Sequence, residues 1–239
     1  MRDLLLGRSP QDIDLAFSAD VKKVSRRIAN VFEGAVYSLD DERQTMRVIV
    51  EIDGEKWKLD IALLRGGSLE GDLRTRDFTV NAMALEILSD KRYELIDLLN
   101  GQLDLKNKVI RSCNTTSLVD DPIRILRSVR LALALGFELD TEVKEQMVKA
   151  VYLVSQVSSE RQRDELFKLL DLVHSINGFR LFRDLGIFEY LFPCFLQENM
   201  ACLDKLEWQL ADSEDKAVDT YIKTALIDER TVQALLKMA

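Results

Sequence analysis

The hydrophobic pattern of the chain changes half-way along, and this change limits the possible folds more than any other feature. Up to about residue 112, short segments with strand-like alternation are mixed with amphipathic helix signals. From about Val119 onward only helical spacing remains. The sequence therefore predicts an α+β head followed by an all-helical part, with the boundary near residues 111–116.

The spacing of apolar residues predicts the individual elements. Strands are predicted at residues 12–17, 35–39, 46–52, 57–63 and 93–96. Helices are predicted at residues 19–32, around 80–84, and at 121–135, 141–153, 159–173 and 178–185. Gly54 follows Asp53 between two of the strands, which indicates a hairpin turn. Pro122 suits the first turn of its helix, and Gly136 suits the position just after the end.

Composition and charge exclude several classes of protein. The chain has 239 residues, 47% of them hydrophobic and 31% charged, which is enough apolar material for a globular core. No stretch approaches the roughly 20 apolar residues of a membrane helix, and the first residues are too short a run for a signal peptide. The net charge of −8 argues against nonspecific coating of nucleic acid, although a local basic surface could still bind RNA.

Cysteine and histidine usage indicates a reducing compartment and carboxylate chemistry. Cys113, Cys194 and Cys202 have no disulfide or zinc spacing, so we expect buried hydrophobic roles and a cytoplasmic protein. His174 is the only histidine and lies near the end of a predicted helix, where a structural or capping role is expected. Any catalysis must therefore rest on Asp and Glu side chains.

Two segments place carboxylates where they could hold a metal. Asp12 and Asp14 are two apart on a predicted strand, so both project to one face while Ile13 turns to the core. Two such carboxylates favour a divalent cation, and Mg²⁺ accepts one or two carboxylates together with waters and phosphates. Asp60 lies within an apolar strand and could complete a two-metal site. A solvated turn at Asp12 and Asp14, or a lysine partner for Asp60, remains an alternative.

Three further segments combine arginines with acids. Arg76, Asp77 and Asn81 could bind a triphosphate and a ribose, or could form a capped helix with surface charges. Asp121 and Arg124 share a helix face and could match the edge of a base, or could form an ordinary ion pair. Arg127 and Arg130 are interpreted as a solvated or RNA-facing stripe. The segment from Ser159, which includes Glu160 and Arg161, opens a helix by capping.

The order of these segments resembles the class II tRNA nucleotidyltransferases. These are the CCA-adding enzymes of bacteria and eukaryotes and their bacterial poly(A) polymerase relatives. The resemblance rests on Arg2-Asp3 with the Asp12-Ile13-Asp14 motif, Arg76-Asp77-Phe78-Thr79-Val80-Asn81-Ala82, Asp121-Pro122-Ile123-Arg124, and Glu160-Arg161 with Glu165. It covers about residues 1–195. It implies a polymerase-β-like nucleotidyltransferase head at 1–112, a helical neck at 113–180 and the start of a helical body at 181–239.

The resemblance also implies an activity and assigns roles. It implies template-independent, two-metal transfer of CMP or AMP from CTP or ATP to a tRNA 3′ end, with Mg²⁺ as cofactor and tRNA as partner. Asp12 and Asp14 would bind metal. Asp60 is predicted as the third catalytic carboxylate from its strand position, and not from the resemblance. The implied nucleotide-binding residues are Arg2, Asp3, Arg76, Asp77, Asn81, Asp121, Arg124, Arg127, Glu160 and Arg161. A poly(A) polymerase and a catalytically weak RNA-binding fragment are the alternative functions.

The chain departs from the family pattern at several places. The family has a Gly-Gly loop before Val-Arg-Asp, whereas this sequence starts at Met1-Arg2-Asp3, and family members continue further at the C-terminus. Thr75 stands in place of the first arginine of Arg-Arg-Asp, and Asp120 replaces a glutamate. These departures suggest truncation at both ends. The link at residues 64–75 is shorter than the flexible loop of CCA-adding relatives, which predicts addition of CC without A.

Overall fold

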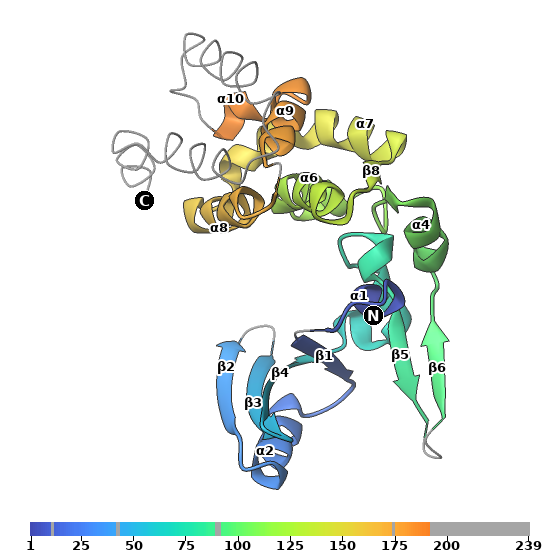
Figure 1. The fold of residues 1–239 in the computed structure, drawn as a ribbon, viewed down its shortest axis with the longest axis vertical. Helices are drawn as coiled ribbons and strands as arrows, with labels where there is room; N and C mark the ends of the chain where they lie inside the picture. The colour runs from blue at the N-terminus through green and yellow to red at the C-terminus, as the bar shows by residue number, and fades with distance from the viewer. Residues whose placement is uncertain (11, 42–43, 89–91, 174, 192–239) are drawn as a thin grey trace. The chain divides into compact units, whose positions relative to one another are not determined.

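The computed structural model describes most of the chain up to residue 191 (Figure 1). The residues left out are 11, 42–43, 89–91, 174 and 192–239. The predictions for His174, Cys194 and Cys202, and most of the predicted region 181–239, therefore fall outside the described residues.

Contacts divide the chain into two compact units. The first unit comprises Met1–Arg76 and Asn81–Gly101. The second comprises Asp77–Val80 and the chain from Gln102 onward. The chain thus passes from one unit to the other at three points, two of which lie in the segment that carries Arg76, Asp77 and Asn81.

The first unit is built on a four-stranded sheet in the order β1-β4-β3-β2 (Figure 1). The strands are β1 (Asp12–Phe17), β2 (Ala35–Asp40), β3 (Thr45–Ile52) and β4 (Glu55–Leu63). β1 runs parallel to β4, whereas β3 is antiparallel to both β4 and β2. These bounds confirm the four strands predicted before residue 64.

The turn between β3 and β4 confirms the predicted hairpin. Asp53 and Gly54 have φ angles of 54° and 81°. A two-residue turn with positive φ at both positions is the I′ type, whose twist matches that of the flanking strands.

Helix α2 (Val21–Val31) covers one face of this sheet and confirms the helix predicted at 19–32 (Figure 1). It begins at Asp20, whose side chain accepts a hydrogen bond from the backbone N–H of Lys23 at 3.0 Å. Val21 and Ala29 are buried on the side that faces the sheet and belong to the same core as Val48, Val50 and Ile61. The opposite face of the sheet carries the polar side chains of the candidate site.

Shorter elements complete the first unit. They are α1 (Arg2–Leu5), η1 (Arg65–Gly67), α3 (Leu69–Arg74), β5 (Ala84–Ile87) and β6 (Tyr93–Ile96). β5 and β6 form an antiparallel ribbon, and β6 confirms the strand predicted at 93–96.

The helix predicted around residues 80–84 is wrong. This segment forms only a 3₁₀ turn, η2 (Thr79–Asn81), before β5 begins. Phe78, Val80 and Ala82 are all fully buried, so the segment has no solvent face of the kind an amphipathic helix needs. The backbone of Thr79 donates to the carbonyl of Arg111 at 2.9 Å, and this tertiary bond replaces a helical one.

The second unit is mainly helical, as predicted. Its elements are α4 (Gly101–Asn107), β7 (Val109–Ile110), α5 (Ser117–Asp120), α6 (Ile123–Leu135), β8 (Glu138–Leu139), α7 (Thr141–Ala150), η3 (Val151–Gln156), α8 (Ser159–Leu170), α9 (Ile176–Asp184) and α10 (Phe188–Leu191). Pro122 stands directly before α6, and Gly136 ends it with a left-handed φ of 67°. The expectation that strands stop near Val119 is wrong at one place, because β8 pairs with β7. A two-residue strand is too short to show alternation.

The expected buried position of Cys113 is confirmed. Cys113 is buried and carries a free thiol. In the part of the chain that the structure describes, no helix has the length and apolar character needed to cross a bilayer.

Candidate active site

Three carboxylates lie on the open face of the sheet in the first unit. Asp12 and Asp14 are exposed on β1, while Ile13 and Leu15 pack against the core on the other side. Asp60 on β4 is the register partner of Asp14, so its side chain projects to the same face. The same-face arrangement expected of Asp12 and Asp14 is therefore present, with Asp60 beside them.

Asp60 is held by an arginine that the sequence analysis did not single out. Arg47 on β3 is the register partner of Asp60. Its Nε donates to Oδ1 and its Nη2 to Oδ2 of Asp60, each at 2.7 Å. The alternative of a lysine partner for Asp60 is thus corrected to an arginine that binds both oxygens. A row of charges crosses three strands in the order Asp14, Asp60, Arg47.

The electrostatics of this row favour a cation beside Asp14. Loss of surrounding water raises the pKa of Asp14, and the negative charge of Asp60 raises it further, while Arg76 opposes the shift. The hydrogen bonds to Asp60 raise the pKa of Arg47. The charged form of Asp14 is therefore only partly compensated, by Arg76, whereas Asp60 has a counter-ion bound to both of its oxygens.

The donor set fits a divalent metal. Among the described residues, no group of three or more acid, cysteine or histidine side chains could hold a metal ion. Two carboxylates are sufficient for Mg²⁺, which completes its shell with waters and substrate phosphates. Asp12 and Asp14 meet that requirement. The raised pKa of Asp14 shows that its charged form is unfavourable, and a bound cation would stabilise that charged form.

Two arginines of the first unit are fixed by acids and by Asn81. Arg76 donates from Nε and Nη2 to Oδ2 of the buried Asp72, at 3.0 and 2.9 Å. Nη1 of Arg2 donates to the side-chain oxygen of Asn81 at 2.9 Å, and Nε and Nη2 of Arg2 donate to Asp3. The hydrogen bonds from Arg2 lower the pKa of Asp3. Arg2, Asp3 and Asn81 thus form one cluster, which the sequence could not reveal because 79 residues separate Arg2 from Asn81.

Asp77 belongs to an ionic network of the second unit. Its Oδ2 accepts from Nη1 of Arg127 at 3.2 Å, and its Oδ1 accepts from the backbone N–H of Phe78. Nε of Arg127 donates to Glu165 at 3.2 Å, and Nε of Arg130 donates to the other oxygen of Glu165 at 2.6 Å. Glu165 is 4% exposed. Of the two interpretations of Arg127 and Arg130, the solvated stripe is wrong, because both guanidinium groups bind the buried Glu165 on α8. The RNA-facing stripe stays a prediction.

Asp121 and Arg124 lie together at the start of α6, as their spacing predicted. Nε of Arg124 is 3.9 Å from Oδ2 of Asp121, and Arg161 on α8 donates to that same oxygen at 2.9 Å. Nη1 of the buried Arg124 donates to the hydroxyl of Ser117 at 2.7 Å. Glu160 is exposed at the start of α8.

Ser117 links two of the sequence-predicted groups. Its hydroxyl accepts from Arg124 and donates to the backbone carbonyl of Asp77 at 3.2 Å. Sequence analysis missed Ser117, Arg47 and Asp72. Only Asp72 left a local signal, because it precedes Arg76 by four residues on a predicted charged segment.

Comparison with known families identifies the family to which the chain belongs. Residues 1–111 match the family described as "Poly A polymerase head domain". Residues 136–198 match the family described as "Probable RNA and SrmB- binding site of polymerase A". The chain belongs to the tRNA nucleotidyltransferase and poly(A) polymerase family. Its head has the polymerase-β-like nucleotidyltransferase fold.

Curated members of this family resemble the chain along most of its length. A CC-adding tRNA nucleotidyltransferase of Geobacter sulfurreducens is 39% identical over 176 residues, which is 74% of this chain and 40% of the relative. A CC-adding tRNA nucleotidyltransferase of Halalkalibacterium halodurans is 33% identical, covering 80% of the chain and 48% of the relative. A CCA-adding enzyme of Streptococcus suis is 32% identical, covering 80% and 49%. The chain therefore spans about half the length of these relatives.

Solved structures of the family have the same fold. A tRNA nucleotidyltransferase complexed with a primer tRNA and an incoming ATP analogue superposes with a TM-score of 0.76 at 27% identity, over 99% of this chain and 73% of that one. The Thermotoga maritima CCA-adding enzyme complexed with tRNA gives 0.78 at 27% identity, over 99% and 59%.

Proposed function

We propose that the protein transfers CMP from CTP to the 3′ end of tRNA without a template, as a CC-adding tRNA nucleotidyltransferase. The observation that carries the proposal is the exposed pair Asp12 and Asp14, with Asp60 in register beside them, on the sheet of a nucleotidyltransferase head. In the reaction, the RNA 3′-hydroxyl oxygen bonds to the α-phosphorus of the nucleotide, and the hydroxyl proton is released. The bond from that phosphorus to the bridging oxygen breaks, and pyrophosphate leaves.

Asp12 and Asp14 are the residues that would hold the metal. Nucleotidyl transfer in this family implies a divalent metal, and we propose Mg²⁺ because the donors are carboxylates with open positions for water and phosphate. Bound Mg²⁺ would lower the pKa of the 3′-hydroxyl and neutralise charge that develops on phosphate. Asp60, neutralised by Arg47, would keep the neighbouring carboxylates in place and limit the negative charge that faces the triphosphate.

The remaining residues would bind and select the nucleotide. Arg76, oriented by Asp72, would contact the triphosphate. The cluster of Arg2, Asp3 and Asn81, in the same unit, would also bind the nucleotide. Asp77, held by Arg127, would accept a hydrogen bond from the ribose. Asp121 and Arg124 would match the base edge by hydrogen bonds, with Glu160 and Arg161 supporting them from α8.

Two observations favour CC addition over complete CCA addition. The link at residues 64–75 is folded into η1 and α3, and the buried Asp72 ties it down by accepting from the backbone of Arg65 and from Arg76. Such a link has little freedom to reposition a base-reading pair for a second base. In addition, relatives with 39% and 33% identity are CC-adding enzymes.

The experiment is incorporation of labelled CTP and ATP into tRNA that lacks its 3′ end, with Mg²⁺ present. We expect incorporation by the wild type, and none by Asp12→Asn or Asp14→Asn. RNA binding without incorporation would contradict the enzyme proposal and favour a catalytically weak RNA-binding protein. Long adenylate ladders would favour a poly(A) polymerase, which the description of the matching head family keeps as the second candidate. Because tRNA is the proposed substrate, we also propose a cytoplasmic location.

A further inference from the structure

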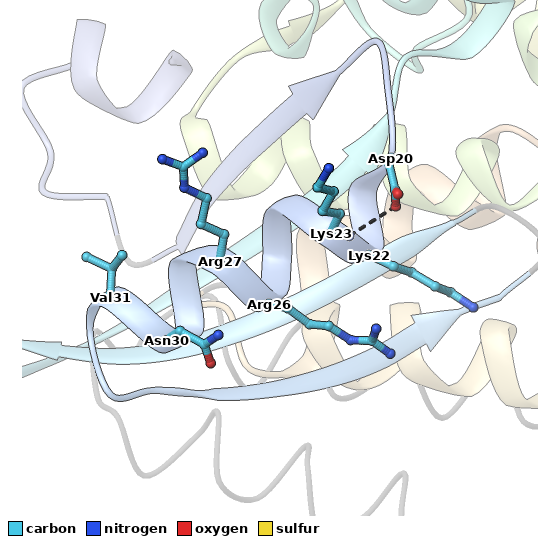
Figure 2. Close-up of a pocket in the computed structure, with 7 residues that line it drawn as sticks. All are labelled: Asp20, Lys22, Lys23, Arg26, Arg27, Asn30 and Val31. Carbon is cyan, nitrogen blue, oxygen red and sulfur yellow. Dashed lines mark hydrogen bonds between the residues drawn. The ribbon is translucent and has the colours of Figure 1, made fainter.

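A concentrated basic surface lies on helix α2, on the head unit of a chain whose net charge is −8. We define the α2 basic face as Lys22, Lys23, Arg26 and Arg27, all of which are exposed. Between Val21 and Val31 the helix has no acidic residue. The four cations line a shallow pocket together with Asp20, Asn30 and Val31 (Figure 2).

The cations form two rows along the helix. Lys22 and Arg26 are four residues apart, as are Lys23 and Arg27, so each pair lies about 6 Å apart along the axis on one side of the helix. Figure 2 shows Lys23 and Arg27 extending to one side of α2, and Lys22 and Arg26 to the other. Lys22 also contacts Asp41 at 3.3 Å, an exposed pair that water screens.

This surface lies on the side of the head opposite the three carboxylates. The buried residues Val21, Ser25 and Ala29 face the sheet from α2. Asp12 and Asp14 project from the other face of that sheet, on the strand that presents Ile13 to the core. The α2 basic face therefore cannot hold the reacting 3′ end or the incoming nucleotide, and it needs another ligand.

We infer that the α2 basic face binds the sugar-phosphate backbone of the RNA substrate, at a segment away from the reacting 3′ end. The inference rests on the proposed function. Rows of lysine and arginine suit phosphates, and no aromatic side chain lines the pocket to stack on a base, so the contact is independent of RNA sequence. A protein partner fits less well, because protein interfaces have an apolar core and are depleted in lysine, whereas Val31 is the only apolar lining residue.

The test uses the whole chain and the double variant Lys23→Gln/Arg27→Gln. Glutamine keeps helix propensity, so α2 should remain folded. The matched control is Lys106→Gln/Lys108→Gln, which removes two exposed cations at and just after the end of α4, outside the segment that matches the RNA-binding family. The Kd for labelled tRNA lacking its 3′ end is measured between 50 and 200 mM salt. We expect the α2 variant to bind about tenfold more weakly at the lower salt, with the salt slope reduced by about one per removed cation.

Activity measurements separate this inference from the proposed function. The α2 variant should show a raised KM for tRNA, with kcat and the KM for CTP unchanged. If the wild type incorporates nucleotide and the α2 variant matches the control in Kd and salt slope, only this inference fails. If the wild type does not incorporate, the proposed function fails, while the binding data still decide about α2.

Two further outcomes would also overturn the inference. The first concerns a short RNA with only the last four nucleotides of the acceptor. On this RNA we expect the α2 variant and the control to have the same Kd. An equal loss on that short RNA would mean that the substitutions act at the active site. A changed sedimentation coefficient of the variant without RNA would assign the surface to contact between copies of the chain.

Discussion

At the scale of single residues, Asp14 combines a proposed metal-binding role with an unfavourable environment. Its pKa is raised by reduced hydration and by Asp60, so the folded chain holds a proton there more readily than the unfolded chain does. Wild-type stability should therefore rise as pH falls through the raised pKa of Asp14. Ionisation of Asp14 therefore costs the folded state more free energy than it costs the unfolded state.

The first prediction follows from this sign. Asp14→Asn should abolish incorporation and also raise the urea midpoint of unfolding at pH 7 above that of the wild type. The difference in midpoint should shrink as pH is lowered, because the wild-type carboxyl becomes neutral too. Urea titrations at pH 7 and at about pH 4.5 check this, with Glu55→Gln as the control for loss of one exposed acid on β4. A midpoint lower than wild type at pH 7 would contradict the electrostatic argument.

The second prediction concerns Arg47, which binds both oxygens of Asp60. Arg47→Ala should leave Asp60 without its counter-ion beside Asp14, which adds negative charge where we propose that the triphosphate binds. We expect kcat/KM for CTP to fall roughly tenfold, a loss of about 1.4 kcal/mol of transition-state stabilisation. Direct titration with Mn²⁺ should show tighter metal binding, because Asp60 becomes available as a ligand.

Arg47→Lys separates charge from geometry. Lysine keeps the positive charge but cannot form the two-pronged contact with a carboxylate. It should restore the metal affinity more fully than it restores kcat/KM. Equal values for Arg47→Lys and wild type in both measurements would show that the fork geometry is irrelevant.

At the scale of elements, the close approach of α2 and β2 to β3 depends on Gly34. A Cβ at position 34 would collide with the backbone carbonyl of Ile49 and approach a side-chain carbon of Val50 at 2.9 Å. Neither neighbour is a flexible surface group, because Val50 belongs to the buried core.

The third prediction is that Gly34→Ala destabilises the head by about 1–3 kcal/mol, the usual cost of forcing extra volume into a packed region. The free energy of unfolding from urea titration measures the loss. Gly7→Ala provides the comparison, because no atom lies near a Cβ built at Gly7, although its φ of 70° adds some backbone strain. A smaller loss at Gly34 than at Gly7 would contradict the packing argument.

Elements with strong periodicity were predictable from sequence, whereas elements fixed by tertiary contacts were not. The four sheet strands and helix α2 follow from alternation and helical spacing. The segment around Phe78 failed because its apolar run is buried on all sides and its backbone bonds to Arg111. In the site, the shared face of Asp12 and Asp14 follows from the strand period alone. The contacts of Arg47 and Ser117 join distant parts of the chain or depend on strand register, which no local pattern encodes.

At the scale of the whole molecule, the choice between CC and CCA products tests whether the link at residues 64–75 can reposition the residues that we propose read the base. One pair, Asp121 and Arg124, would have to match both cytosine and adenine in a complete CCA-adding enzyme. Each good pair of base-edge hydrogen bonds contributes roughly 1–3 kcal/mol of discrimination, so a fixed pair that suits one base rejects the other. A second base needs something that moves the pair.

The link at residues 64–75 is unsuited to that task. Gly66 and Gly67 both have left-handed φ angles, 64° and 71°, but they serve a tight turn that leads into α3. Asp72 then fastens α3 to the backbone of Arg65 and to Arg76. Gly66 and Gly67 therefore belong to a folded connection of twelve residues, counted from 64 to 75, and do not make it flexible.

The fourth prediction is that the protein adds two cytidines and stops. The assay supplies CTP and ATP together with tRNA that ends at the nucleotide before the CCA sequence, and it resolves product length at single-nucleotide resolution. We expect products two nucleotides longer than the substrate, and poor addition of ATP to tRNA that already ends in CC. Asp72→Ala, which removes the contacts of Asp72 with Arg65 and Arg76, should weaken nucleotide binding. It should not create A addition, because the link at residues 64–75 keeps its short length. Products three nucleotides longer that end in A would show that a link of this length can reposition the base-reading pair.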